Sequence, residues 1–204
     1  MRRREFITLS AFMAALPLSA RAQQKARTAV VGFIHLRSPV DASLLVTAIR
    51  QGLQETGYIE GQNLTIEARW AEGEYDRLPA LAADLVSRKV DVIVTGGGNA
   101  SALAAKGATS TIPIVFETGA DPVEAHLVAS FAHPGGNLTG SNILVAGLNP
   151  KRFELILKLV PSAEVIVLLL NPNYSGVETI MREVQEAATV TGSPAPYPES
   201  CVGR

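Results

Sequence analysis

The 204-residue chain is poor in cysteine, in aromatic residues and in net charge. Its only cysteine, Cys201, lies near the C-terminus, so we expect neither a disulfide framework nor a cysteine metal site. The formal net charge is −1 and there is no basic patch, which disfavours nucleic acid as a partner. His35, His126 and His133 lack the spacing of metal ligands, so we expect no metal and no cofactor. With 47% hydrophobic residues, the composition is typical of a globular protein with a core.

Long hydrophobic runs are also missing. The apolar run Leu9–Leu18 is shorter than the roughly twenty residues of a membrane-spanning helix. It follows an arginine-rich start and precedes Ala20-Arg21-Ala22, a small-x-small cleavage pattern, so residues 1–22 are predicted to be a removable export signal. The Arg-Arg-x-Phe-Ile pattern at Arg3–Ile7 is similar to a twin-arginine signal, and an ordinary secretory signal is the alternative. Either signal predicts a periplasmic protein.

Strand and helix patterns alternate after this signal. Short apolar runs predict strands at Thr28–His35, Asn63–Trp70, Val90–Thr95, Ile112–Phe116 and Leu138–Leu144. Helical spacing predicts helices at Asp41–Thr56 with Asp41 as the cap, at Asp76–Ser87, from about Ala100 to Lys106, and at Val123–Phe131. This alternation, with short connections, predicts an α/β fold with a doubly wound parallel sheet over residues 28–146.

A second unit is predicted over residues 147–192. It comprises a linker at Gly147–Pro150, a helix at Lys151–Val160, a strand at Val165–Leu170 and a helix at Gly176–Val190. A strand this apolar needs neighbours on its edges, yet residues 193–204 form a proline-rich tail that suits neither a helix nor a central strand. The second unit therefore docks against the first sheet or another chain, or the sequence is a truncated form of a longer protein.

The stretch Thr95–Ser101 is the first candidate for a binding surface. Three glycines end an apolar strand and a helix begins after them, and in open parallel sheets ligands lie at the carboxyl ends of the strands. Backbone N–H groups at the start of this helix, together with a hydroxyl, are suited to a carboxylate. The residues are Gly97, Gly98, Asn99, Ala100 and Ser101. The alternative is a tight turn in which Asn99 caps the helix.

Further candidates lie after other strands. Asp121 could hold an ammonium group of a ligand or cap the following helix, Ser38 offers a hydroxyl after the first strand, and Tyr174 could stack on an aromatic ligand. The full set of additional candidates is Ser38, Thr118, Gly119, Ala120, Asp121, Asn142 and the turn Asn171–Tyr174.

Four segments resemble a known family. They are MRRREFI with ARAQ, VDVIVTGGGNASALAAK, IPIVFETGADPVEAHLVASFAHPGGNLTGSN and KRFELILKLVPSAEVIVLLLNP. They look like ABC-transporter substrate-binding proteins, and in particular the branch that binds tryptophan or tyrosine, although His133 stands where that family usually has arginine. The resemblance extends to about residue 191, and the residues after Gly192 do not look like the family.

The resemblance implies a fold and a function. The fold is that of the type I periplasmic binding proteins, in which two lobes close over a ligand; here the first lobe would be whole and the second partial. The function is to bind a small solute such as an amino acid and deliver it to a membrane permease, without catalysis and as a monomer when complete.

Two alternatives stay open. One is an exported α/β enzyme with a nucleotide cofactor, which is suggested by Gly96–Ser101 and the downstream Glu117. Against it, Gly96-x-Gly98-x-x-Ser101 lacks the last glycine of that motif and comes after the third strand rather than the first. The other is an inactive fragment that lacks half of the ligand-enclosing structure.

Overall fold

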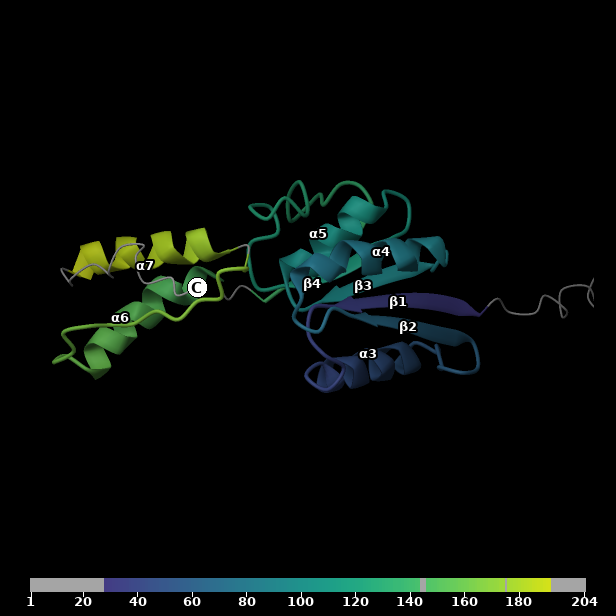
Figure 1. The fold of residues 1–204 in the computed structure, drawn as a ribbon, viewed down its shortest axis with the longest axis horizontal. Coiled ribbons are helices and arrows are strands. Elements are labelled where there is room, and N and C mark those ends of the chain that lie inside the picture. The colour runs from purple at the N-terminus through teal and green to yellow at the C-terminus, as the bar shows by residue number, and fades with distance from the viewer. Residues whose placement is uncertain (1–27, 144–145, 175, 192–204) are drawn as a thin grey trace, which may run out of the picture.

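The computed structural model describes residues 28–143, 146–174 and 176–191, so the expected export signal and proline-rich tail lie outside the described residues. One five-stranded parallel sheet lies at its centre, in the order β2-β1-β3-β4-β5 (Figure 1). The strands are β1 (Ala29–His35), β2 (Leu64–Trp70), β3 (Val92–Gly96), β4 (Ile114–Thr118) and β5 (Leu138–Asn142). Each overlaps a predicted strand, and the expected α/β fold with a parallel sheet is confirmed.

Helices lie on both faces of this sheet. Helix α3 (Ser43–Glu55) is on one face, and α4 (Leu78–Ser87), preceded by the short helix η2 (Tyr75–Arg77), lies with α5 (Asn99–Ala108) on the other (Figure 1). The face under α4 and α5 is the better covered one, because these two helices bury side chains in the core whereas α3 has no buried residue. The main core accordingly contains the fully buried Ile34, Ile93 and Ile114. In the part of the chain that the structure describes, no helix is long and apolar enough to cross a membrane.

The two middle strands are tied together at their starts. The Val30 N–H donates to Asp91 Oδ2 and the Asp91 N–H donates to the Val30 carbonyl, both at 2.8 Å, across 61 positions of sequence. Further along β1, a Cβ on Gly32 would lie 3.1 Å from side-chain atoms of Leu85 and Val90. The absence of a side chain at Gly32 thus lets α4 pack closely on the sheet.

Helix α3 begins differently from the expectation. Its first residue is Ser43, and Ala42 before it makes no capping hydrogen bond through its side chain. The predicted cap, Asp41, instead accepts a hydrogen bond from the Ser38 hydroxyl at 2.7 Å. The Asp41 carboxylate is therefore engaged in the turn before the helix, and the prediction that it caps the helix was wrong.

The predicted helix at Val123–Phe131 was also wrong, because this segment forms turns. The Asp121 carboxylate accepts the N–H of Val123 at 2.7 Å, a bond of the kind that starts a helical turn, so the interruption comes later in the segment. His126 then adopts a left-handed conformation with φ of +54°, which interrupts helical geometry. The chain turns back so that Leu127, with 1% exposed surface, enters the main core.

Beyond the sheet, two helices form a second, smaller core. Helices α6 (Asn149–Leu159) and α7 (Val177–Thr191) lie side by side and bury Phe153, Val184 and Ala188 between them (Figure 1). They confirm the helices expected in this region. The short helix η3 (Ala146–Leu148) leads directly into α6, so all four residues of the expected linker Gly147–Pro150 are helical.

The predicted strand at Val165–Leu170 is not formed. Its odd-numbered residues are open to solvent, with Val165 65%, Val167 85% and Leu169 95% exposed. A strand exists only where a neighbour pairs with its N–H and C=O groups, and the described residues place no strand beside this segment. The composition is that of a buried strand, but its partner is missing from the described residues.

Four charged side chains link β2 to α4. Arg69 contacts Asp84 at 2.6 Å and Glu67 at 3.2 Å, while Arg88 contacts the same two carboxylates at 3.1 and 3.2 Å. The hydrogen bond from Arg69 is the main cause that lowers the pKa of Asp84 below its ordinary value of 3.8. A carboxyl whose pKa is lowered by folding stabilises the fold above its unfolded pKa, and that contribution is lost as the pH falls through the folded pKa.

We therefore expect Asp84→Asn to lower the free energy of unfolding at pH 7 and to flatten its decline below about pH 4. Urea unfolding followed by circular dichroism between pH 7 and pH 3 measures both effects. The control is Asp76→Asn, which removes an exposed carboxylate outside this network and should leave the acid decline unchanged. Equal pH profiles for Asp84→Asn and the wild type would contradict the stabilising role of the network.

Candidate functional site

The carboxyl ends of neighbouring strands bring the candidate loops to one edge of the sheet. His35 at the end of β1 is paired with Gly96 at the end of β3, and Thr118 at the end of β4 is paired with Asn142 at the end of β5. Since β3 lies between β1 and β4, the turns after all of these strands share this edge. The edge is where small ligands bind in open parallel sheets.

The glycine bend, Gly96–Gly98, requires glycine for two different reasons. A Cβ on Gly96 would lie 2.6 Å from His35 Cδ2, and one on Gly97 would lie 3.0 Å from the backbone nitrogen of Leu36. Gly97 and Gly98 also have φ values of +82° and +105°, which side chains strongly disfavour. The bend is therefore packed directly against the turn after β1.

Helix α5 starts from this bend without a side-chain cap. Gly98 is its N-cap residue, no side-chain hydrogen bond caps the helix, and the alternative role of Asn99 as the cap is therefore wrong. The first N–H groups of a helix carry a partial positive charge and need acceptors. An anionic group at this end would supply them.

Polar side chains are buried beneath the start of α5. Asn99, Ser101, Thr95 and Thr118 are each at most 4% exposed. The Thr118 hydroxyl donates to Asn99 Oδ1 and accepts the N–H of Ala120 at 3.1 Å, so it ties α5 to the turn after β4. Within the described residues the hydroxyls of Thr95 and Ser101 have no hydrogen-bond partner. Buried hydroxyls are usually satisfied, so these two keep unused bonding capacity beside the bend.

Two other candidates take part in local turns. Asp121 is half-buried, and its Oδ1 accepts the N–H groups of Val123 at 2.7 Å and Glu124 at 3.2 Å. Ser38 is half-buried and donates to Asp41. Both side chains hold loop geometry, and Asp121 keeps a second carboxylate oxygen. The alternative in which Asp121 caps a following helix is not borne out, because the segment after it forms turns. Gly119 and Ala120 are half-buried between β4 and Asp121.

The remaining candidates lie at or near the same edge. Asn142 is the half-buried last residue of β5. Tyr174 is half-buried, and its pKa is raised first by burial and then by the neighbouring Tyr75. Tyr75 belongs to η2, which comes after β2 at the carboxyl edge. That the Asn171–Tyr174 turn faces the loops of the sheet stays a prediction.

Thr95 and His35 also lie at this edge, although neither can be identified as a site residue from the sequence. Thr95 lies in the candidate stretch, but its sequence pattern indicates only the end of a strand, and His35 is isolated from other possible metal ligands. His35 is 5% exposed and stacks on Phe33, with ring centroids 5.8 Å apart. Its ring centroid lies 5.9 Å from that of Trp70. The sequence feature that points to His35 as a site residue is its predicted position as the last residue of a central strand.

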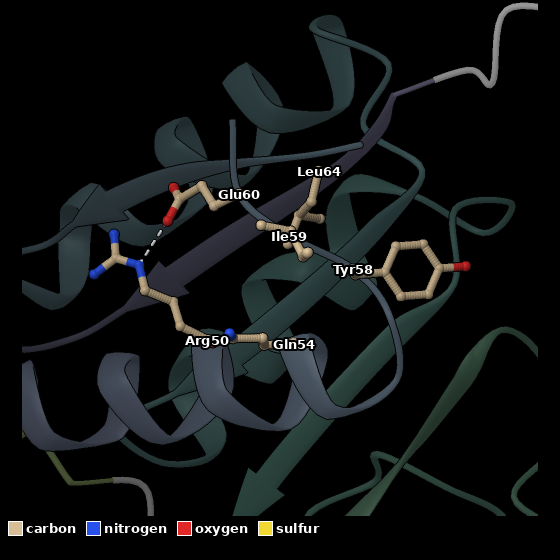
Figure 2. A pocket seen from close by; sticks show the side chains of 6 residues that line it. All are labelled: Arg50, Gln54, Tyr58, Ile59, Glu60 and Leu64. Carbon is tan, nitrogen blue, oxygen red and sulfur yellow. Dashed lines mark hydrogen bonds and ion pairs between the residues drawn. The ribbon is translucent and has the colours of Figure 1, made fainter. Parts of the chain in front are cut away.

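A hollow of about 210 Å³ lies at the opposite edge of the sheet, where β2 begins and α3 ends (Figure 2). It is lined by Arg50, Gln54, Tyr58, Ile59, Glu60 and Leu64. Arg50 and Glu60 are paired with each other at 2.7 Å across it, as the dashed line in Figure 2 shows. The hollow is smaller than usual ligand pockets and its charges are already matched, so it is not the candidate site.

The sheet order and the loops at its carboxyl edge define an α/β protein with the fold of the type I periplasmic binding proteins. The sequence model of the ABC transporter substrate binding protein family matches residues 33–192, and the chain belongs to this family. The tyrosine-binding protein of Clostridioides difficile (strain R20291) is 36% identical over 121 residues, which are 59% of this chain and 34% of that protein.

Two solved structures are similar over most of the chain. A conserved domain protein from Vibrio cholerae has a TM-score of 0.75 at 29% identity, over 83% of this chain and 56% of that one. The ABC domain in complex with L-Trp from Streptococcus pneumoniae has a TM-score of 0.69 at 26% identity, over 81% of this chain and 55% of that one. The chain thus spans about half the length of these structures and about a third of the curated relative.

Proposed function

We propose that this protein binds an amino acid with an aromatic side chain at the carboxyl edge of its sheet, as the substrate-binding component of an ABC transporter. The observation that carries the proposal is the uncapped start of α5 at the glycine bend, with the free hydroxyls of Thr95 and Ser101 beneath it. A ligand carboxylate fits this environment, because it accepts N–H and O–H groups and complements the helix dipole. The relatives named above bind tyrosine and L-Trp.

The ammonium group and the side chain of the ligand would contact other residues. The second oxygen of Asp121, from the turn after β4, is suited to the ammonium group of an amino acid. Tyr174 provides an aromatic face from the second unit, and Ser38 and Asn142 add polar groups at either side. We assign residues 28–146 to a first lobe and 147–192 to part of a second lobe. Closure of two lobes over the ligand is the signal that a permease would recognise.

The proposed place of action is the periplasm, after removal of residues 1–22. Substrate-binding proteins of this family are typically extracellular or periplasmic. The partner would be a permease in the inner membrane, and binding requires no catalysis, no metal and no cofactor.

Thermal-shift and calorimetric titration with L-tyrosine, L-tryptophan and L-tyrosinamide tests the proposal. We expect the two amino acids to raise the melting temperature, because a ligand that binds only the folded protein stabilises it. L-tyrosinamide lacks the carboxylate and should bind at least about tenfold more weakly, the equivalent of a charge-assisted hydrogen bond.

A matched pair of variants locates the carboxylate. Ser101→Ala should weaken L-tyrosine binding about fivefold through the loss of one hydrogen bond. Ser110→Ala, the same change at an exposed position just before β4 and hence at the opposite edge, should leave binding unchanged. Equal binding of L-tyrosine and L-tyrosinamide would remove the carboxylate assignment, and no shift with any amino acid in a folded protein would remove the amino-acid ligand.

A further inference from the structure

The imidazole of His35 joins two loops of the candidate site. Its Nδ1 accepts the backbone N–H of Arg37 at 3.0 Å, in the turn between β1 and Ser38. Its opposite edge lies against the glycine bend, since Cδ2 and Cε1 would lie 2.6 and 3.2 Å from Cβ atoms on Gly96 and Gly97. A single buried ring therefore sets the spacing between the turn after β1 and the bend after β3.

This role depends on the protonation of the ring. A nitrogen that accepts a hydrogen bond carries no proton, so His35 is neutral with its proton on Nε2. Burial is the main cause that lowers the pKa of His35 below 6.5, the charge of Arg37 lowers it further, and Asp41 acts in the opposite direction. Phe33, Trp70, Leu36 and Leu45 also lie against the ring or the bend, and none of these four ionises in the neutral pH range.

We propose that His35 is a positioning residue whose neutral ring holds the β1 turn and the glycine bend in the ligand-binding arrangement, and whose protonation releases the Arg37 N–H and weakens ligand binding. A proton on Nδ1 removes the acceptor and places a buried charge between the two loops. The inference rests on the proposed ligand site at this edge. The geometry of the two loops, however, can be followed without any ligand.

The direction of the pH effect follows from linkage. Because the folded state lowers the pKa of His35, the unfolded chain binds more protons between the folded pKa and about 6.5. The stabilising effect of the neutral ring is therefore complete above the unfolded pKa and is lost as the pH falls through this window. Ligand affinity depends on the folded protein alone, so it should decline as the pH falls through the folded pKa of His35.

The first experiment uses no ligand. Trp70 is the only tryptophan of the chain and contacts His35, and a protonated imidazole quenches indole emission more strongly than a neutral one. We expect Trp70 emission to fall between pH 8 and pH 5 with a midpoint below 6.5, and the protection factor of the Arg37 amide, which is its exchange rate corrected for the intrinsic effect of pH, to fall over the same range. His35→Asn should abolish the transition, because Oδ1 can replace Nδ1 as the acceptor but does not titrate.

The matched control is His126→Asn, which removes an exposed histidine and suits the left-handed conformation at that position. It should keep the Trp70 transition. A transition that survives in His35→Asn, or that disappears in His126→Asn, would overturn the proposal.

The second experiment measures L-tyrosine affinity by calorimetry at pH 8 and pH 5.5. We expect binding by the wild type to be weaker at the lower pH, by at most about fivefold, which corresponds to the loss of one hydrogen bond in a fully protonated ring. His35→Asn should bind equally at both pH values, and His35→Leu, which has no acceptor, should bind weakly at both. Tight binding by His35→Leu, or unchanged pH dependence in His35→Asn, would refute the positioning role. No binding by any form, together with the expected exchange and emission changes, would refute the proposed ligand while supporting the His35 link between the loops.

Discussion

Gly140→Ala is expected to lower the free energy of unfolding by about 3 kcal/mol, through overpacking between two paired strands. An added Cβ would meet the carbonyl oxygen of Phe116, the residue paired with Gly140 in β4, and would lie 2.7 Å from its ring atoms. Phe116 is 4% exposed and packed in the main core, so it has no room to move aside. Urea unfolding followed by circular dichroism measures the loss, which should detach β5 first.

Gly52→Ala provides the matched control for this substitution. A Cβ on Gly52 would meet nothing within 4 Å, and the residue lies within α3. Alanine is the better helix former, so this variant should gain about 0.5–1 kcal/mol. Wild-type stability of Gly140→Ala would mean that β5 does not pair closely with β4.

Thr118→Val is expected to lower the free energy of unfolding by about 2 kcal/mol, although it preserves the volume of the side chain. The change leaves Asn99 Oδ1 without its donor and the Ala120 N–H without its acceptor, and Asn99 is 4% exposed. A buried polar group left unsatisfied bears its full desolvation cost. Because these bonds join α5 to the turn after β4, affinity for L-tyrosine should decline as well.

Thr118→Ser separates the hydroxyl from the methyl group. It keeps both hydrogen bonds and removes one buried methyl, so it should retain most of the binding and lose only about 1 kcal/mol of stability. Chemical denaturation and calorimetric titration of the two variants measure these effects. Identical behaviour of Thr118→Val and the wild type would show that the hydroxyl does not link the two loops.

The parallel sheet was predictable from local patterns in the sequence. Short apolar runs such as Val90–Thr95, each ended by glycine or polar residues, specify buried strands, and their alternation with helical spacing specifies parallel pairing. The location of the candidate loops at one edge follows from the same logic, because all carboxyl ends of a parallel sheet point in one direction. Which of those residues contact a ligand stays a prediction.

Two elements could not be predicted because their form depends on contacts beyond the local pattern. At Val123–Phe131 the spacing of apolar residues is helical, yet His126 adopts a left-handed conformation and the segment forms turns. At Val165–Leu170 the composition is that of a strand, but a strand also requires a neighbour to pair with.

The same limit applies to the site. Asn99 has the chemistry of a helix cap, but its amide oxygen accepts a hydrogen bond from Thr118, a partner 19 positions further along the chain. His35 is an isolated histidine in the sequence, and its link between two loops depends on its pairing with Gly96 across the sheet. These contacts join residues that are far apart in the chain, so they cannot be predicted from the spacing of residues within a short segment.

The bond between Val30 and Asp91, 61 positions apart, has a consequence for how the protein is made. Parallel pairing over such a separation is slow, because closing a long loop costs conformational entropy before any stabilising contact has formed. During synthesis the first strand leaves the ribosome well before its neighbour β3 exists. In that interval only β2 is available to pair with β1, so the edge of β1 that β3 later covers stays open and can associate with other chains.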